Sequence, residues 1–291
     1  MAPLNATLAC RELPLTRHAR AEHLADRAVQ ALVAEAMLTP KPALVDQRGP
    51  GAHPDLDLGR LLRSAHSLRA SFRSMALAAS VGAPDVTLRE RLGALGRNGE
   101  QRMLAATGGS NAHRGAIWVL GLWVAALAYG PAGRTLTEIA ALAARLARLP
   151  DRHAPAAPSN GARVCRLFGV RGARGEAAAG FPHVLRVGLP ALHAARRRGG
   201  DEQCARLDAL MAIMASLDDT CLLHRGGWPA LRAAKRGARG VLALGGTASA
   251  TGRRALLALD AELLQRYASP GGGADLLAAC LFVDSLRGRE V

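Results

Sequence analysis

The sequence predicts an all-α protein, a compact single-domain bundle of many helices. Apolar residues recur with the 3.6-residue period of a helix along most of the 291-residue chain. Segments of period two and clusters of β-branched residues, which are typical of strands, are not found in this pattern. Alanine, leucine and arginine favour helices, and aromatic residues make up only 3% of the chain. The core must therefore be built from alanine, leucine and valine.

The expected elements follow one another in a simple order. Residues 1–20 mix proline, arginine and histidine without a period, so we expect a loose arm there and one domain over residues 21–291. The first helix should run over Glu22–Leu38 and end at Pro40 and Pro42, because proline cannot continue a helix. Further helical patterns cover residues 57–80, 87–106, 113–128, 135–149, 175–198, 203–223, 228–243, 253–268 and 274–287.

A stretch rich in helix breakers separates two halves of the pattern at residues 150–162. It is either a linker between two domains or an ordered surface loop of one domain. Candidate site residues occur on both sides of it, so we favour one domain.

The charge balance points to a polyanionic partner. Lysine and arginine number 38 against 23 acidic residues, which gives a net charge of +15, and only Lys41 and Lys235 are lysines. Arginine binds phosphate through two parallel hydrogen bonds. A nucleotide, a coenzyme, a nucleic acid or an acidic protein would each fit this composition.

Cysteine spacing and hydropathy restrict the compartment. Five widely spaced cysteines without a CxxC pair argue against a zinc cluster and a disulfide framework. The N-terminus carries no apolar secretory segment. The apolar run within residues 115–133 is about fourteen residues long, whereas a membrane-spanning helix needs about twenty. We therefore expect a cytoplasmic protein that makes no contact with a membrane.

A glycine-containing turn at residues 106–115 leads directly into an apolar helix. The N–H groups near Gly108 and Gly109 would suit a phosphate at the positive end of that helix, with His113 and Arg114 beside it. The turn is neither a P-loop nor a dinucleotide-binding fingerprint. A plain helix cap is an equal alternative.

Three other turns have a similar character. Residues 269–275 precede an apolar helix, and Asp275 in its first turn is either a favourable charge at the helix dipole or a metal or nucleotide contact. Residues 169–176 and 225–227 place arginines on flexible backbone beside helix ends. Such arginines suit phosphate binding, although loop arginines are usually just solvated.

Several carboxylates stand out by their position. Glu35 falls within the apolar half of its helix, where an ionised carboxylate is costly unless it is neutralised, so it is either a paired structural residue or a functional one. Residues 51–57 combine two carboxylates with a histidine. Helical periodicity places Asp218 in the apolar arc and Asp219 at its edge. Carboxylates beside phosphate-binding turns would hold Mg²⁺, and helix caps or surface pairs are the alternative.

Taken together, these segments resemble the triphosphoribosyl-dephospho-CoA synthases, which make the prosthetic-group precursor of citrate lyase and malonate decarboxylase. The family usually has glycine at Ala43, lysine at Arg114 and, in its citrate-lyase branch, Gly-Asp-Thr-Asn where this chain reads residues 218–221 as Asp-Asp-Thr-Cys. The comparison at residues 218–221 favours Asp219 over Asp218 as the family ligand. The Asp-Asp-Thr-Cys form looks more like the malonate-decarboxylase branch of the family. The matching blocks span about residues 22–287 and comprise residues 40–46, 51–55, 106–115, 172–177, 219–220, 225–227 and 269–277.

The resemblance implies a glycosyl transfer. The 2′-hydroxyl of 3′-dephospho-CoA would attack the anomeric carbon of the ATP ribose and expel adenine, and a separate transferase would load the product onto an acyl carrier. The reaction needs bound phosphates, a base and a hydrogen-bond donor to adenine.

Candidate residues for each role follow from the resemblance. His53 and His113 would assist adenine departure, because imidazole titrates near working pH. Glu35, Asp46, Asp219 and Glu176 would hold Mg²⁺ or act as the general base. The nucleotides would be bound by Gly108, Gly109, Asn111, Arg114, Arg174, Arg225, Gly226, Gly271 and Gly272.

Two other classes of function remain open at this stage. A nucleic-acid-binding protein would explain the charge, but the arginines are scattered through helices and stacking aromatic residues are few. A carrier-docking partner of the decarboxylase would not need Glu35 or the glycine turns.

Overall fold

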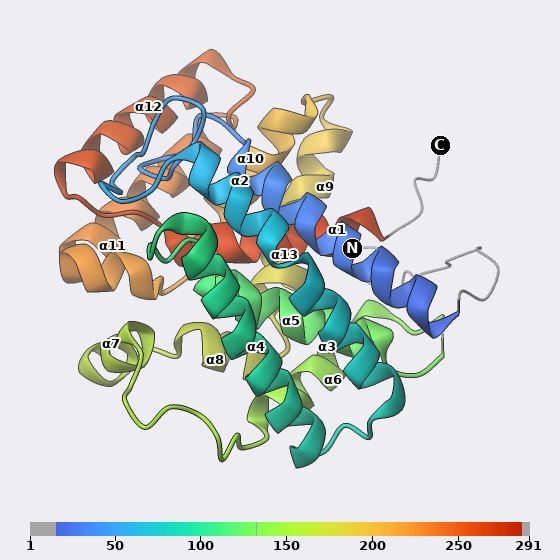
Figure 1. The fold of residues 1–291 in the computed structure, drawn as a ribbon. Coiled ribbons are helices and arrows are strands. Elements are labelled where there is room, and N and C mark those ends of the chain that lie inside the picture. The colour runs from blue at the N-terminus through green and yellow to red at the C-terminus, as the bar shows by residue number, and fades with distance from the viewer. Residues whose placement is uncertain (1–15, 132, 287–291) are drawn as a thin grey trace.

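The computed structural model describes residues 16–131 and 133–286, and their regular secondary structure is helical throughout (Figure 1). An isolated bridge between Asp46 and Gly49 is the one β feature recorded for these residues. The all-α prediction is confirmed. The helices are α1 (Arg17–Ala36), α2 (Leu58–Ser67), α3 (Arg69–Val81), α4 (Val86–Thr107), α5 (Arg114–Ala128), α6 (Leu136–Arg148), α7 (Asn160–Phe168), α8 (Gly172–Ala178), the π-helical η1 (His183–Gly188), α9 (Leu189–Arg197), α10 (Glu202–Ser216), α11 (Thr220–Ala243), α12 (Ala250–Gln265) and α13 (Gly271–Ser285).

Most helices begin at a residue whose side-chain oxygen accepts a hydrogen bond from the first turn. Thr135 and Glu138 form a reciprocal capping box at α6, which satisfies two backbone donors at once. The same role is played at other N-termini by Thr16, Asp57, Asp85, Ser159, Asp201, Asp219 and Ser249. Local sequence therefore fixes where these helices start.

Several predicted boundaries are wrong. Residues 17–20 of the expected arm belong to α1, while residues 1–15 lie outside the described residues. The segment 57–80 forms two helices, and 175–198 is divided because Phe181 adopts a left-handed conformation with φ of 56°.

Further differences concern the second half of the chain. Residues 217–219 separate α10 from α11, and α11 continues to Ala243 across a kink at Gly227, where φ is 58°. The stretch 150–162 also ends earlier than expected, since Ser159 caps the short helix α7, for which the sequence pattern offered no prediction.

The core is centred on α5 and α13, which are apolar on nearly all sides and are enclosed by the other helices (Figure 1). Small residues allow close packing: a Cβ atom at Gly121 of α5 would lie 2.8 Å from Met75 Sδ of α3. One continuous cluster of buried residues joins α1 with α13 and includes both sides of the 149–159 loop, so the single-domain prediction holds.

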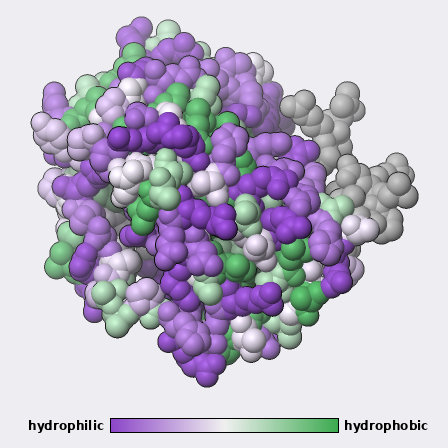
Figure 2. Space-filling view, in the orientation of Figure 1, coloured by the Kyte–Doolittle hydropathy of each residue, from purple (hydrophilic) through white to green (hydrophobic). Residues whose placement is uncertain are grey.

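The face shown in Figure 2 is mostly hydrophilic, with small scattered apolar areas. Within residues 16–131 and 133–286, no helix combines the length and the apolar character needed to cross a membrane.

Candidate active site

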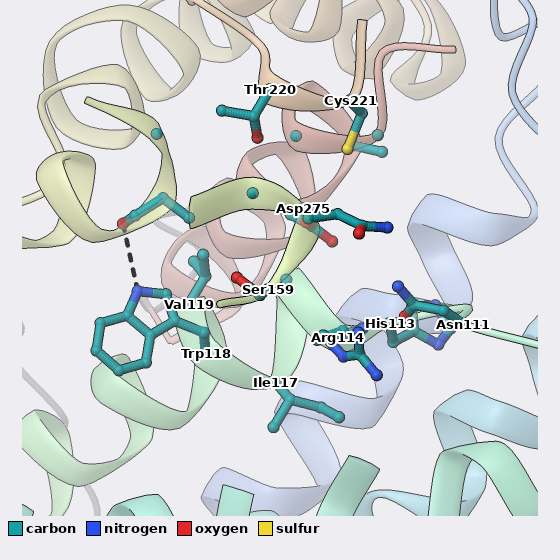
Figure 3. Close-up of a pocket in the computed structure, with 18 of the residues that line it drawn as sticks. Asn111, His113, Arg114, Ile117, Trp118, Val119, Ser159, Thr220, Cys221 and Asp275 are labelled. Carbon is teal, nitrogen blue, oxygen red and sulfur yellow. Dashed lines mark hydrogen bonds between the residues drawn. The ribbon is translucent and has the colours of Figure 1, made fainter. Parts of the chain in front are cut away.

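A cavity of about 1190 Å³ opens between the N-terminal ends of α5, α11 and α13 and the inner sides of α1 and α4 (Figure 3). The loop before α7 and the helix α8 complete its wall. Pockets for one small ligand usually measure 300–1,000 Å³. The cavity therefore has room for a large ligand or for two ligands side by side.

Most residues predicted for the site line this cavity. They come from segments that are far apart in the chain and that the packing of α1, α5, α11 and α13 brings together. They are Glu35, His53, Asn111, His113, Arg114, Arg174, Glu176, Asp219, Arg225, Gly271 and Gly272.

Asp46 does not line the cavity. Its carboxylate accepts hydrogen bonds from the backbone N–H groups of Lys41 (2.8 Å) and Arg48 (2.7 Å), from the Thr39 hydroxyl and from the Arg48 guanidinium. Burial alone would raise its pKa, but these donors hold the pKa of Asp46 below its ordinary value. Asp46 therefore fastens the loop after α1 and is removed from the catalytic and metal-binding set.

Three predicted glycines also lie outside the cavity lining. Gly108 and Gly109 adopt left-handed conformations (φ of 69° and 95°) and end α4, with the N–H groups of both donating to Leu104 O. Gly226 packs tightly, since a Cβ atom there would lie 2.5 Å from Ala230 Cβ. The turn after α4 is thus a helix C-cap, and the phosphate role predicted for its glycines is withdrawn.

Asp219 joins the positive ends of two helices. One carboxylate oxygen accepts from Cys221 N (2.7 Å) and Leu222 N (3.4 Å) in α11, and the other accepts from Gly273 N (2.8 Å) in α13. Burial raises the pKa of Asp219, and the backbone donors only partly offset this effect. Asp218, in contrast, pairs with Lys235 at 2.6 Å and is half exposed. The preference for Asp219 over Asp218 therefore agrees with the geometry.

Asp275 lines the cavity from the N-terminal part of α13 (Figure 3). Its Oδ2 atom approaches α5 so closely that a Cβ atom at Gly115 would be only 1.9 Å away. Burial raises the pKa of Asp275 well above its usual range, and the charges of Asp219 and Glu35 raise it further, while the backbone of Ala116 opposes them. Asp275 is therefore a cavity-lining carboxyl group whose charged form is disfavoured by burial and by two neighbouring carboxylates.

Glu35 forms a buried ion pair with Lys41. The Lys41 ammonium donates to Glu35 Oε1 at 2.6 Å and to the Glu35 carbonyl at 2.7 Å, and both residues face the cavity. Glu35 is therefore both paired and close to the site. Lys41 itself, 1% exposed, is a cation that the sequence analysis did not select.

The two predicted histidines are neutral at pH 7. His53 accepts from Arg225 Nη2 at Nδ1 (3.1 Å) and lies 2.7 Å from Ser269 Oγ through Nε2; burial and the Arg225 charge lower its pKa to about 4. His113 contacts Ser64 Oγ at 2.7 Å, and burial, with a smaller effect of nearby Lys41, lowers its pKa to about 4. Neutral His113 can offer an N–H hydrogen bond through Nε2, whereas the single N–H of neutral His53 is directed at Ser269, and neither ring stores a proton for an adenine leaving group.

The remaining predicted polar residues have local partners. Arg114 pairs with Glu100 at 3.0 Å, and Asn111 accepts from the Arg114 N–H at 3.1 Å. Glu176 accepts from both the backbone and the ring of His183, each at 2.8 Å. Glu176 is therefore committed to His183 and does not join Asp219 and Asp275.

The four predicted Mg²⁺ ligands do not converge. In the part of the chain that the structure describes, residues 16–131 and 133–286, no group of three or more His, Cys, Asp or Glu is placed to hold a metal ion. Mg²⁺ commonly uses one or two carboxylates together with substrate phosphates and water. Asp219, buried in the cavity wall, is compatible with that simpler arrangement.

Comparisons with known proteins identify the family of the chain. A family model described as ATP:dephospho-CoA triphosphoribosyl transferase matches residues 21–291. The chain is 57% identical to a probable 2-(5''-triphosphoribosyl)-3'-dephosphocoenzyme-A synthase of Azotobacter vinelandii over 94% of each protein. It is 53% identical to the synthase of Klebsiella pneumoniae, over 94% of this chain and 98% of that protein. No solved structure matches.

The resemblance noted in the sequence is thereby confirmed over nearly the whole chain. The matched residues include α1, which carries Glu35, and α13, which carries Asp275. The chain belongs to the ATP:dephospho-CoA triphosphoribosyl transferase family.

Proposed function

We propose that this chain transfers the 5-triphosphoribosyl group of ATP to the 2′-hydroxyl of 3′-dephospho-CoA and releases adenine. The product would be passed to a separate transferase and become the prosthetic group on the acyl carrier subunit of malonate decarboxylase. The observation that carries the proposal is the cavity, in which the buried carboxylate of Asp275 faces a wall that also holds Arg114, Arg174 and Arg225.

The reaction forms one bond and breaks one. The dephospho-CoA oxygen bonds to the anomeric carbon, the bond from that carbon to the adenine nitrogen breaks, and the hydroxyl proton passes to a base. Asp275 is the base in this proposal, because its raised pKa strengthens it as a proton acceptor. Asp219 positions it, since Asp219 binds the Gly273 N–H two residues before Asp275.

Adenine departure is supported by hydrogen bonding. His113 Nε2 has no hydrogen-bond partner among the described residues and its ring faces the cavity. A neutral imidazole N–H donates to a ring nitrogen of the purine as negative charge develops there. His53, which also lines the cavity, is held between Arg225 and Ser269.

Mg²⁺ is the proposed metal, and it would be held by phosphate oxygens with Asp219 as the protein ligand. When bound, it would neutralise phosphate charge. We expect chelation with EDTA to abolish adenine release, added Mg²⁺ to restore it, and the melting temperature of the free protein to stay unchanged. A protein that melts earlier after chelation would instead contain a structural metal site.

The decisive experiment incubates the purified protein with ATP, Mg²⁺ and 3′-dephospho-CoA and measures free adenine by chromatography. Adenine should appear only when both nucleotides are present. Adenine formed from ATP alone, or none formed with both, contradicts the proposed transfer. Parallel loading of malonate decarboxylase and citrate lyase carrier subunits, with each system's own transferase, tests the assigned pathway.

A further inference from the structure

Arg89 of α4 is a buried cation to which the described part of the chain offers no hydrogen bond. The residue is 5% exposed, and its Nε atom is buried and has no partner in the described residues. Its single ion pair joins Nη1 to Asp151 Oδ2 at 3.6 Å, beyond hydrogen-bond distance. Asp151 Oδ2 is already bound by Arg97 at 2.9 Å. The buried Nε–H therefore has no acceptor among the described residues, and such a charged donor is costly unless a ligand supplies one.

The surroundings of Arg89 hold further positive charge. Its guanidinium lies over the Trp118 ring at 5.1 Å, and the Arg174 guanidinium lies over the same ring at 6.0 Å. The Trp118 Nε1–H of α5 donates to Ala173 O of α8 at 3.2 Å, and this hydrogen bond fixes the orientation of the ring (Figure 3). Burial lowers the pKa of Arg89, and the nearby Arg174 and Arg97 charges contribute to this shift.

At this end of the cavity Asp151 pairs with both Arg89 and Arg97, and the Arg174 guanidinium lies over the same ring as Arg89. The packing preserves the arrangement, because a Cβ atom at Gly93 would lie 2.1 Å from Asp151 Oδ2. Arg89, Arg97, Trp118, Asp151 and Arg174 all line the cavity. We call these five residues the Arg89 subsite.

We propose that the Arg89 subsite binds the phosphoanhydride chain of a nucleotide substrate, with phosphate oxygens as the missing acceptors of Arg89. This inference rests on the proposed function and extends it to residues for which the sequence suggested no role. A guanidinium binds two phosphate oxygens at once, and the fixed Trp118 ring holds it in orientation. The triphosphate of ATP and the diphosphate of dephospho-CoA share this chemistry.

The position of the subsite suits such a chain. Trp118 follows Gly115 by three residues on α5, which is about 4.5 Å along the helix axis. Gly115 contacts Asp275, the proposed base. Trp118 and Gly115 are thus about one helical turn apart on α5, so phosphates bound at Arg89 and the reacting carbon at Asp275 would share one cavity wall.

The test is calorimetric binding to the whole protein, with inorganic tripolyphosphate, ATP, adenosine and 3′-dephospho-CoA as separate probes. Arg89→Met removes the charge but keeps most of the volume, and the matched control Arg91→Met removes an exposed charge from the same helix. We expect Arg89→Met to weaken tripolyphosphate binding by about 10- to 100-fold, the range for charged hydrogen bonds. Adenosine binding and all binding to Arg91→Met should be unchanged.

The two nucleotide probes identify the source of the phosphates. A selective loss for ATP assigns the subsite to the triphosphate, and a selective loss for dephospho-CoA assigns it to the diphosphate. Equal affinities in the wild type and Arg89→Met, or equal losses in both arginine variants, overturn the proposal.

A second variant guards against a folding defect. Asp151→Asn removes the one carboxylate that competes for Arg89 and Arg97, so tripolyphosphate should bind several-fold more tightly. Weaker binding by a variant with unchanged circular dichroism would contradict the proposal. The adenine-release assay is independent: a wild type that binds tripolyphosphate through Arg89 but forms no adenine disproves the proposed reaction and leaves the anion subsite intact.

Discussion

The close approach of Asp275 to α5 allows a sharp test of its role. Replacing Gly115 with alanine places a Cβ atom 1.9 Å from Asp275 Oδ2, whereas ordinary contact begins at 3.4 Å. The carboxylate must therefore move by about 1.5 Å. A misplacement of about 1 Å at a reacting group can reduce the rate by about 10²-fold. We expect a similar loss of kcat for adenine release in Gly115→Ala, without any change in charge.

The stability of this variant should fall modestly. Glycine to alanine within a helix contributes about 0.4–1 kcal/mol, whereas overpacking against the carboxylate costs about 1–3 kcal/mol. The matched control is Gly240→Ala in α11, where a new Cβ atom meets nothing within 4 Å. The control should melt about 1–4 °C higher and keep full activity. A Gly115→Ala protein with the wild-type kcat would refute the placement of Asp275 at the reacting centre.

Three other variants test the remaining assignments. Asp275→Asn should reduce kcat by about 10²- to 10⁴-fold. Folding raises the pKa of Asp275, so ionisation of this carboxyl group destabilises the folded wild type as pH rises. The variant should therefore melt at a higher temperature than wild type at pH 8. A lower melting temperature of the variant would argue against a buried carboxylate without an ion pair. Asp46→Asn should lower the free energy of unfolding by about 1 to 2 kcal/mol at pH 7 and leave kcat unchanged, because Asp46 holds a loop outside the cavity. The contribution of Asp46 to the free energy of unfolding is present above its unfolded pKa of about 3.9 and is lost as pH falls. The stabilities of wild type and variant should therefore converge in acid. A variant with reduced kcat would return Asp46 to the catalytic set. Arg225→Met should raise the pKa of His53 from about 4 but keep it below 6.5, since burial is the larger cause; a proton NMR titration that finds no change would contradict the contact.

Local sequence determines much of the fold because helices are local structures. The 3.6-residue period and the capping residues, such as Thr135 and Ser249, fix most helices and many of their ends. The errors occur where backbone conformation depends on packing. Phe181 adopts a positive φ within a segment whose period reads as one helix, and α11 continues through the kink at Gly227.

The same distinction between local features and packing-dependent features applies to the candidate site. Asp219 and Arg225 stand beside helix ends and glycine turns, which are features of consecutive residues, and both line the cavity. Gly108 and Gly109 have the same local appearance, yet their N–H groups close the end of α4. A turn before a helix therefore predicts available donors only when the preceding helix does not use them.

What the sequence alone determined is the class of fold, the resemblance to the family and a set of candidate residues, eleven of which line the cavity. Only the tertiary structure decided that Asp46 is not among the residues that line the cavity, that Asp275 is among them and that Arg89 has an ion pair but no hydrogen bond within the described residues. Arg89, Trp118 and Asp151 come from α4, α5 and the loop before α7, and no short segment contains more than one of them. The physical reason is that burial and charge pairing depend on residues distant in the chain, whereas periodicity and capping depend on neighbours within one or two turns.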